Sequence, residues 1–276
     1  MGEGDRARDR HRWLIAFADR KESALPDLST LDVAACPDDA LEAARLVWRR
    51  RVMNEALSVD LAQHLRRTAG NLDRASETVA HALARLEADE ARHVMLASAV
   101  SARLGVTSTN EPASSSLPAL DERAELAFLR LVLTALCVCE SVSAARFAAV
   151  REHTDLAPFR ACIEAFHRDE LTHAELGFQL LPDAIERARA AIGREAAHAL
   201  VLDELRGTMG HLDRVIGLDL ERQGPLPQAR AQPQDNPGVV EPIVDAIAFY
   251  RALHDDVVPR LEALGLPAAR AWKARR

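Results

Sequence analysis

The chain has 276 residues, of which 48% are hydrophobic and 28% charged, and its formal net charge at pH 7 is −7. Such a chain is long enough to bury a sizeable core, and its acidic balance argues against a general nucleic-acid-binding protein, which would present a basic face. Aromatic residues make up only 4%. Because strands favour aromatic and β-branched residues, this composition predicts an all-α fold.

The N-terminal segment MGEGDRARDRHRW contains arginines but lacks the apolar stretch of a secretory signal. No run approaches 18 uninterrupted apolar residues, so we expect no membrane span and no membrane partner. Of the four cysteines, Cys137 and Cys139 would point about 200° apart on a helix and could not pair. These features favour a reduced, cytoplasmic protein.

Residues 1–39 are expected to form an irregular or partly helical lead-in, after which Asp38 or Asp39 would cap the first long helix. Gly, Pro and Ser-rich breaks then delimit four long helices, at about residues 40–67, 73–104, 119–152 and 157–181. Pro182 should end the fourth helix, because an interior proline removes a backbone hydrogen bond.

Further helical segments are expected at about 183–222, with a break near Gly193, and at about 241–264. Long helices joined by polar connectors are typical of a helix bundle. We therefore divide the chain into a lead-in (1–39), a four-helix bundle (40–181) and a C-terminal helical extension packed on the bundle (182–276).

Ionisable side chains interrupt the apolar face of each central helix. A packed helix buries positions that alternate by four and three residues. In the middle of these inward stripes stand a lone glutamate on the first and third helices and a Glu-x-x-His motif on the second and fourth. The six residues are Glu55, Glu90, His93, Glu140, Glu170 and His173.

These buried groups predict a metal site, because an ionised carboxylate in an apolar interior must be paired or bind a metal. Two divalent cations would neutralise four carboxylates, and the mixed oxygen and nitrogen donors suit iron or manganese. Buried Glu–His hydrogen bonding without a metal is the alternative interpretation.

The spacing of the six residues predicts that they lie at one common level along the bundle. Glu55 and Glu90 are 35 residues apart, and Glu140 and Glu170 are 30 apart. In an antiparallel hairpin each arm would be about 13–16 residues long, which returns the chain to its starting level. The two halves thus resemble two copies of one unit: a glutamate, a hairpin and a Glu-x-x-His motif.

With EARH at 90–93, ELTH at 170–173, and Glu55 and Glu140 on the alternate helices, residues 40–181 resemble the ferritin-like dinuclear metal carboxylate proteins. The resemblance implies two duplicated helix hairpins that hold two iron ions, with manganese or a mixed pair as alternatives. It further implies that Glu90 and Glu170 bridge the ions and that the other four residues are terminal ligands. The segments WRRRVMNEALSV and VVPRLEALGLPAARAW are also similar to bacterial ferritin-like domain proteins of unassigned activity.

The resemblance implies an oxidoreductase: a di-iron oxidase or oxygenase that activates dioxygen to hydroxylate, N-oxygenate, desaturate or cleave a small organic substrate. No catalytic residue beyond the metal ligands is expected. Electrons would come from an external donor, because the chain carries no nucleotide-binding fingerprint. The C-terminal extension favours substrate handling over the alternatives, which are a ferroxidase, iron-storage or peroxide-handling protein and a metal-free helical scaffold. A homodimer is one assembly left open.

The neighbours of the six residues are expected to lie outside the stripes. Four carboxylates are placed on flanking or outer faces, namely Glu87, Asp89, Asp169 and Glu175. For Asp169 an alternative role is to accept the second ring N–H of a ligating histidine across the bundle. Two arginines are expected to be solvated, Arg92 and Arg168. Apolar side chains expected to shape a dry pocket are Val52, Leu136, Phe147 and Phe166.

Overall fold

The computed structural model describes residues 3–21, 24–73, 76–106, 123–217 and 235–275, and throughout these ranges every regular element is helical. The all-α prediction is therefore confirmed for the described residues. In chain order the elements are α1 (Glu3–Ala18), η1 (Val33–Ala35), α2 (Asp38–Gly70), α3 (Glu77–Arg103), α4 (Ala124–Leu131), η2 (Val132–Glu140), α5 (Ser141–Glu152), α6 (Ala157–Ile192), α7 (Arg194–Val215), α8 (Pro242–Arg251), η4 (Ala252–Val257), α9 (Val258–Ala263) and α10 (Ala268–Lys273).

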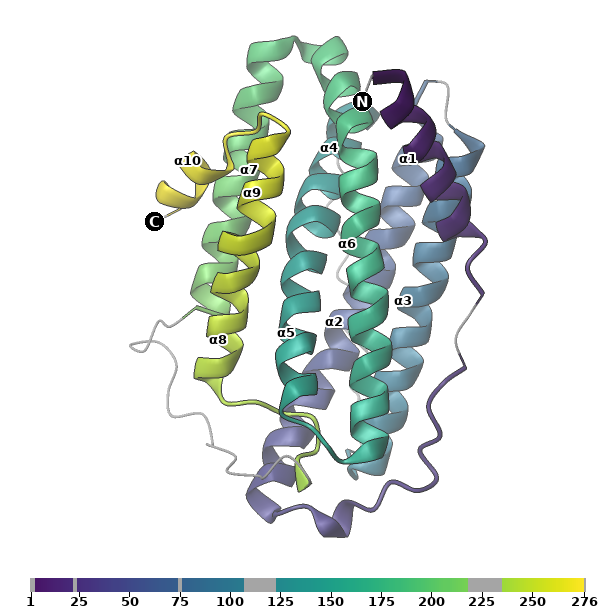
Figure 1. Ribbon diagram of the computed structural model, residues 1–276, viewed down its shortest axis with the longest axis vertical. Coiled ribbons are helices and arrows are strands. Elements are labelled where there is room, and N and C mark those ends of the chain that lie inside the picture. Colours follow the sequence, from purple (N-terminus) through teal and green to yellow (C-terminus); the bar gives the residue numbers. More distant parts are fainter. Residues whose placement is uncertain (1–2, 22–23, 74–75, 107–122, 218–234, 276) are drawn as a thin grey trace.

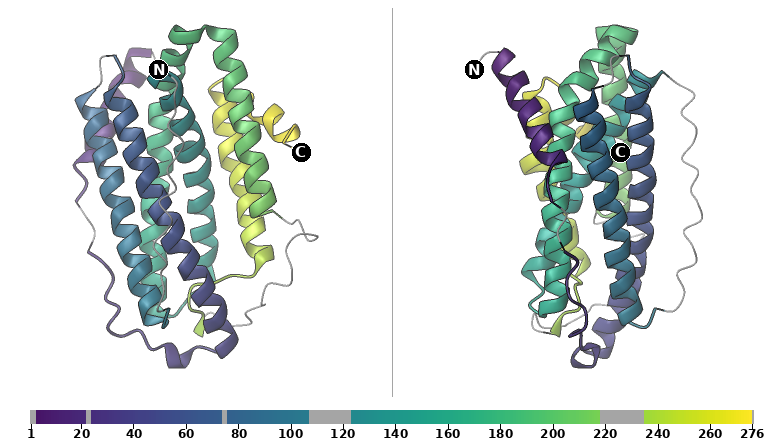
Figure 2. Two further views of the ribbon diagram at one scale, coloured as in Figure 1. Left: turned by 180° about the vertical axis from the view of Figure 1, so that it is seen from behind. Right: turned by 90° about the vertical axis from the view of Figure 1, so that its right-hand side faces the viewer.

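Four long helical rods lie side by side in the centre of the molecule: α2, α3, the continuous α4–η2–α5 rod, and α6 (Figure 1). α2 packs along α3, and α6 packs along η2 and α5. The remaining helices cover two sides of this arrangement (Figure 2). α1 lies against α3 and α6, whereas α7 and the α8–η4–α9 rod lie beside η2 and α5.

The helix ends follow ordinary capping chemistry, with two corrections. The Ser76 side chain caps α3 by accepting from the Val79 N–H, but the N-cap of α2 is Pro37 rather than Asp38 or Asp39, which lie in the first turn. α6 does not end before Pro182; it continues to Ile192. Packing outweighs the lost backbone hydrogen bond, because the residues around the proline are buried in the core.

The predicted break near Gly193 is confirmed. This residue separates α6 from α7 with φ +86°, a left-handed conformation that suits glycine. Several predicted boundaries lie outside the described residues, because 107–122 and 218–234 are not described. They include the Ser-rich loop, the start of the third helix and most of the Pro-rich segment.

The third rod departs from a regular α-helix in a way that the sequence did not predict. Its middle, Val132–Glu140, is a π-helix that ends at a predicted metal ligand. π-Helical turns are rare and are often found at functional sites. α6 approaches this turn very closely at Gly177, where an added Cβ would lie 2.6 Å from Leu136 Cβ and 2.9 Å from the Cys137 backbone N. A glycine is therefore required for this contact.

The hydrophobic core is divided into two clusters along the helix axes. One cluster contains Leu65, Leu86 and Leu181, and the other contains Trp48 and Phe159. On α2, α3 and α6, buried ionisable residues stand between the segments that contribute to each cluster. The helices thus converge on a buried polar layer at mid-height.

The Ala124–Glu152 rod has the length and mean hydropathy, 1.8, of a membrane span. However, 61% of this apolar window is buried inside the protein, as is usual for the core helix of a folded bundle. The rod also carries the partly buried Glu140 carboxyl near its centre.

Candidate metal centre

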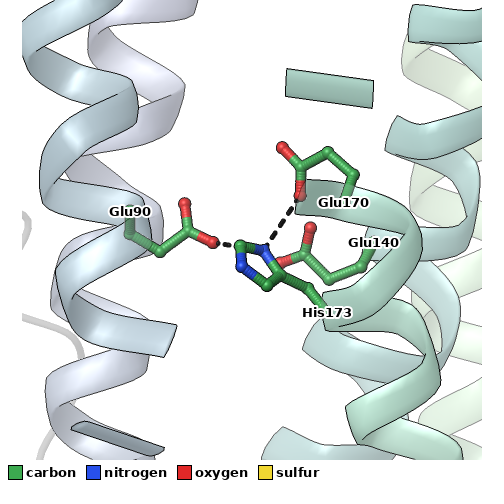
Figure 3. Close-up of side chains that lie close together, drawn as sticks. All are labelled: Glu90, Glu140, Glu170 and His173. Carbon is green, nitrogen blue, oxygen red and sulfur yellow. Dashed lines mark hydrogen bonds and ion pairs between the residues drawn. The ribbon is translucent and has the colours of Figure 1, made fainter. Parts of the chain in front are cut away.

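The six predicted residues come together in the polar layer from all four rods. Two overlapping groups of donors form there: Glu90, Glu140, Glu170 and His173 in one, and Glu55, His93 and Glu170 in the other. Within each group, one ligand atom from each residue lies within 4.8 Å of all the others. Figure 3 shows that Glu90 faces the other three residues of the first group from the opposite side of the centre.

The carboxylates of Glu90 and Glu170 each stand between the two histidines. Glu90 places Oε1 2.9 Å from His173 Nδ1 and Oε2 3.5 Å from His93 Nδ1. Glu170 places Oε2 3.3 Å from His173 Nδ1 and Oε1 3.8 Å from His93 Nδ1. Both carboxylates therefore direct one oxygen towards each end of the centre, which is the geometry that a bridging carboxylate needs.

Glu55 and Glu140 belong to one group each and thus to opposite ends. Glu55 Oε2 lies 3.6 Å from His93 Nδ1. Glu140 is grouped with His173 and not with His93. Each end therefore contains one imidazole, one carboxyl of its own and a share of Glu170.

The polar atoms at this centre are not satisfied by one another. Both Glu90 oxygens and His93 Nδ1 are buried without a well-aligned hydrogen bond, although oppositely charged groups are near. Leaving such atoms unpaired is costly, and bound cations would remove that cost. The donor set, four carboxylates and two imidazoles from the six residues, fits a pair of divalent transition-metal ions in charge and in chemistry.

The other nitrogen of each histidine faces an aspartate from the opposite motif. His93 Nε2 lies 3.4 Å from Asp169 Oδ2, and His173 Nε2 lies 3.5 Å from Asp89 Oδ2. Such partners orient the ring and fix which nitrogen is left to bind a metal. The expectation that Asp89 and Asp169 lie on outer faces is wrong, since each is only 1% exposed, whereas the contact expected between Asp169 and a histidine across the bundle is present.

The arginines near the motifs differ from each other. Arg92 is not solvated as expected; its side chain is 13% exposed and forms ion pairs with Asp89 and Asp169. The prediction for Arg92 is wrong because positions beside the inward stripe are not at the surface here: α1 covers this side of α3 and α6. Arg168 is 51% exposed, as predicted.

The two outer carboxylates behave as predicted. Glu87 and Glu175 lie at partly exposed positions, where they pair with Arg66 and Arg260 respectively. Neither carboxylate belongs to the two donor groups.

Burial and neighbouring charges shift the pKa values of the carboxyl groups of the centre in different directions. Desolvation raises the pKa of Glu55 to about 7, against the opposing effect of His93. Desolvation and repulsion from Glu170 raise the pKa of Glu140 well above its usual value. For Glu90, desolvation is outweighed by the attraction of the two histidines, which lowers its pKa to about 2.

Neighbouring carboxylates raise the pKa values of both histidines. Desolvation opposes the charge, but Asp169 and the glutamates raise the pKa of His93 well above its usual value. Glu90 and Asp89 do the same for the pKa of His173. Protons thus compensate the carboxylates, and a metal ion that binds here must displace them.

A narrow hollow reaches the centre from one side. It is lined by Glu90 and Glu140 and by apolar side chains that include Leu61, Leu86 and Leu136. The hollow encloses ≈ 290 Å³ of empty space, part of it open to solvent, but has room for only about one water molecule. Its size suits a diatomic molecule better than an organic substrate.

The pocket expected around Phe147 and Phe166 is filled with aromatic rings. These two rings stack with centroids 4.9 Å apart, and the Phe166 ring lies 4.7 Å from that of His93. Trp48 packs beside them and donates its indole N–H to the Pro237 carbonyl. This side of the centre is therefore a packed wall, and of the expected pocket residues only Leu136 lines the hollow.

Comparison with models of protein families, with curated proteins and with solved structures found no match. The geometry of the buried centre is therefore the basis on which a function is inferred.

Proposed function

We propose that this chain is a ferritin-like di-iron oxidase or oxygenase that uses dioxygen to oxidise a small organic molecule. The observation that carries the proposal is the convergence of two donor groups, linked by Glu170, from four packed rods. The two related hairpins and their paired Glu-x-x-His motifs support a ferritin-like four-helix bundle with added helices at its C-terminal end.

In this proposal the six residues hold two iron ions, with manganese as the alternative metal. Glu90 and Glu170 would lie between the two ions, Glu55 and His93 would hold one of them, and Glu140 and His173 would hold the other. When bound, the iron pair supplies the electrons and open coordination positions for reaction with dioxygen. The buried Asp residues orient the two imidazoles so that Nδ1 remains directed at the metal position.

The residues around the centre limit the access of water to it. The aromatic wall of Phe147 and Phe166 excludes water on one side. The apolar hollow beside Glu90 and Glu140 would admit dioxygen on another. A larger substrate would need this hollow to widen, and an external donor would supply electrons. We propose a cytoplasmic location for this reaction.

Metal analysis of point variants tests the assignment. Protein purified from iron-supplemented cells should contain two metal equivalents, and Glu90→Ala or His173→Ala should lose most of this metal. His81→Ala is a matched control, because His81 is an exposed histidine on α3. Two equivalents retained in both ligand variants would refute the assignment.

The oxidase and storage functions are separated by the reaction of the ferrous protein with air. An oxidase of this kind should consume dioxygen, remain a small oligomer in size-exclusion chromatography and form no mineral. Assembly into a shell together with prompt ferric mineral formation would favour iron storage.

A further inference from the structure

The two Asp-Glu-x-x-His motifs differ in charge at one position. The first reads Asp-Glu-Ala-Arg-His over 89–93, and the second reads Asp-Glu-Leu-Thr-His over 169–173. In the first motif Arg92 reaches across to pair with Asp169, the partner of His93. The equivalent residue of the second motif is Thr172, which brings no positive charge to Asp89.

An arginine from outside the four rods lies beside Thr172 and Asp89. Arg20 follows α1, and its Nη1 donates to Thr172 Oγ1 at 2.7 Å. Its Nη2 donates to Asp89 Oδ2 at 2.8 Å and lies 3.2 Å from Asp169 Oδ1. One guanidinium thus contacts the threonine that replaces the arginine and both of the aspartates that face the histidines.

The position of Arg20 is fixed by several contacts. Arg85 donates from Nη1 to the Arg20 carbonyl at 2.9 Å and also pairs with Asp89. The Arg20 guanidinium lies 5.5 Å from the centroid of the Phe17 ring. Phe17 is 4% exposed and meets the His173 ring edge-on at 6.4 Å. The end of α1 therefore packs beside the histidines on the side of their Nε2 atoms, where the two aspartates lie.

We propose that Arg20 is a positioning residue for the metal centre, supplying to the second motif the guanidinium that Arg92 supplies to the first. It holds Asp89 and Asp169 in place opposite the Nε2 atoms of His173 and His93. This inference rests on the proposed metal site and makes docking of α1 a condition of tight metal binding. Loss of such indirect partners typically lowers metal affinity by about 10–100-fold.

The test compares Mn²⁺ affinity and the visible spectrum of bound Co²⁺ among variants of the full chain. Arg20→Met removes the guanidinium but keeps an apolar stem beside Phe17. We expect its affinity to fall by about 10–100-fold and its Co²⁺ spectrum to change. Arg12→Ala is the control, because the Arg12 side chain is 81% exposed on the same helix. This control should bind like the wild type.

A rescue variant shows whether Arg20 positions the aspartates or only anchors α1. The double variant Arg20→Met/Thr172→Arg restores an arginine at the position that Arg92 has in the first motif, and should recover most of the lost affinity. Unchanged affinity in Arg20→Met, or a loss that Thr172→Arg does not restore, would overturn the proposal. The wild-type stoichiometry in the same titration reports separately on the metal site itself.

Discussion

Replacing Gly177 by alanine tests whether the close contact between α6 and η2 positions Glu140. The new Cβ would meet Leu136 Cβ at 2.6 Å and the Cys137 backbone N at 2.9 Å, and the backbone of the π-helix cannot rotate away as a flexible side chain could. Overpacking of this kind costs about 1–3 kcal/mol, against a gain of about 1 kcal/mol from the better helix propensity of alanine.

Gly207→Ala is the matched control, because Gly207 lies inside α7 with no neighbouring atom within 4 Å of the added Cβ. It should gain the propensity term alone, so the two variants should differ by about 2 kcal/mol. At about 2–4 °C per kcal/mol, the Tm of the Gly177 variant should lie about 4–8 °C below that of the control.

The assay is thermal unfolding of the metal-free protein, followed by a Mn²⁺ titration of each variant. Because Leu136 and Glu140 belong to the same π-helix, the Gly177 variant should also bind metal more weakly. Equal Tm values for the two variants would refute the packing argument. A lower Tm with unchanged metal affinity would show that this contact does not position Glu140.

Three further predictions concern protons, the histidine partner and the aromatic wall. The uncharged forms of Glu55 and Glu140, whose pKa values are raised, stabilise the metal-free fold at low pH, and for Glu55 this is lost as the pH rises through about 7. The increase in Tm caused by Mn²⁺ should therefore grow between about pH 6 and 8; a constant increase would contradict the proton displacement. Asp169→Asn should weaken Mn²⁺ binding by about 10–100-fold in calorimetry, because an amide orients the His93 ring less well; wild-type affinity would show that other contacts hold this ring. Phe166→Ala should lower the free energy of unfolding by about 3–5 kcal/mol in urea titrations, since the ring is fully buried; a loss below about 1 kcal/mol would mean that the wall is loosely packed.

The six donors could be predicted from sequence because helical periodicity alone places them on inward stripes. Glu90 and His93 are three residues apart and share a face on any α-helix. The burial of Asp89, Asp169 and Arg92 was not predicted, although a histidine contact was considered for Asp169. Their burial depends on α1, and no local pattern says where a lead-in helix docks. The sequence indicates a shared role for the two aspartates only when the two motifs are compared, because both motifs begin with Asp-Glu.

The number and order of the long helices were predictable for a similar reason, but two of their internal features were not. The π-helix is stabilised by its fit against α6, a tertiary contact that Gly177 permits and that helix propensity does not encode. α6 continues past Pro182 because core contacts outweigh a local preference. In both cases long-range packing decides the backbone conformation.

The two donor groups have a consequence for how the protein is made. Each group takes residues from both hairpins, and Glu170, near the middle of α6, belongs to both. A chain still being synthesised can complete neither group until α6 has left the ribosome and the second hairpin has docked on the first. Binding of a metal would therefore require a chain that has been made at least through α6 and whose two hairpins have docked, and copies that lack α6 or are misassembled would not hold the metal.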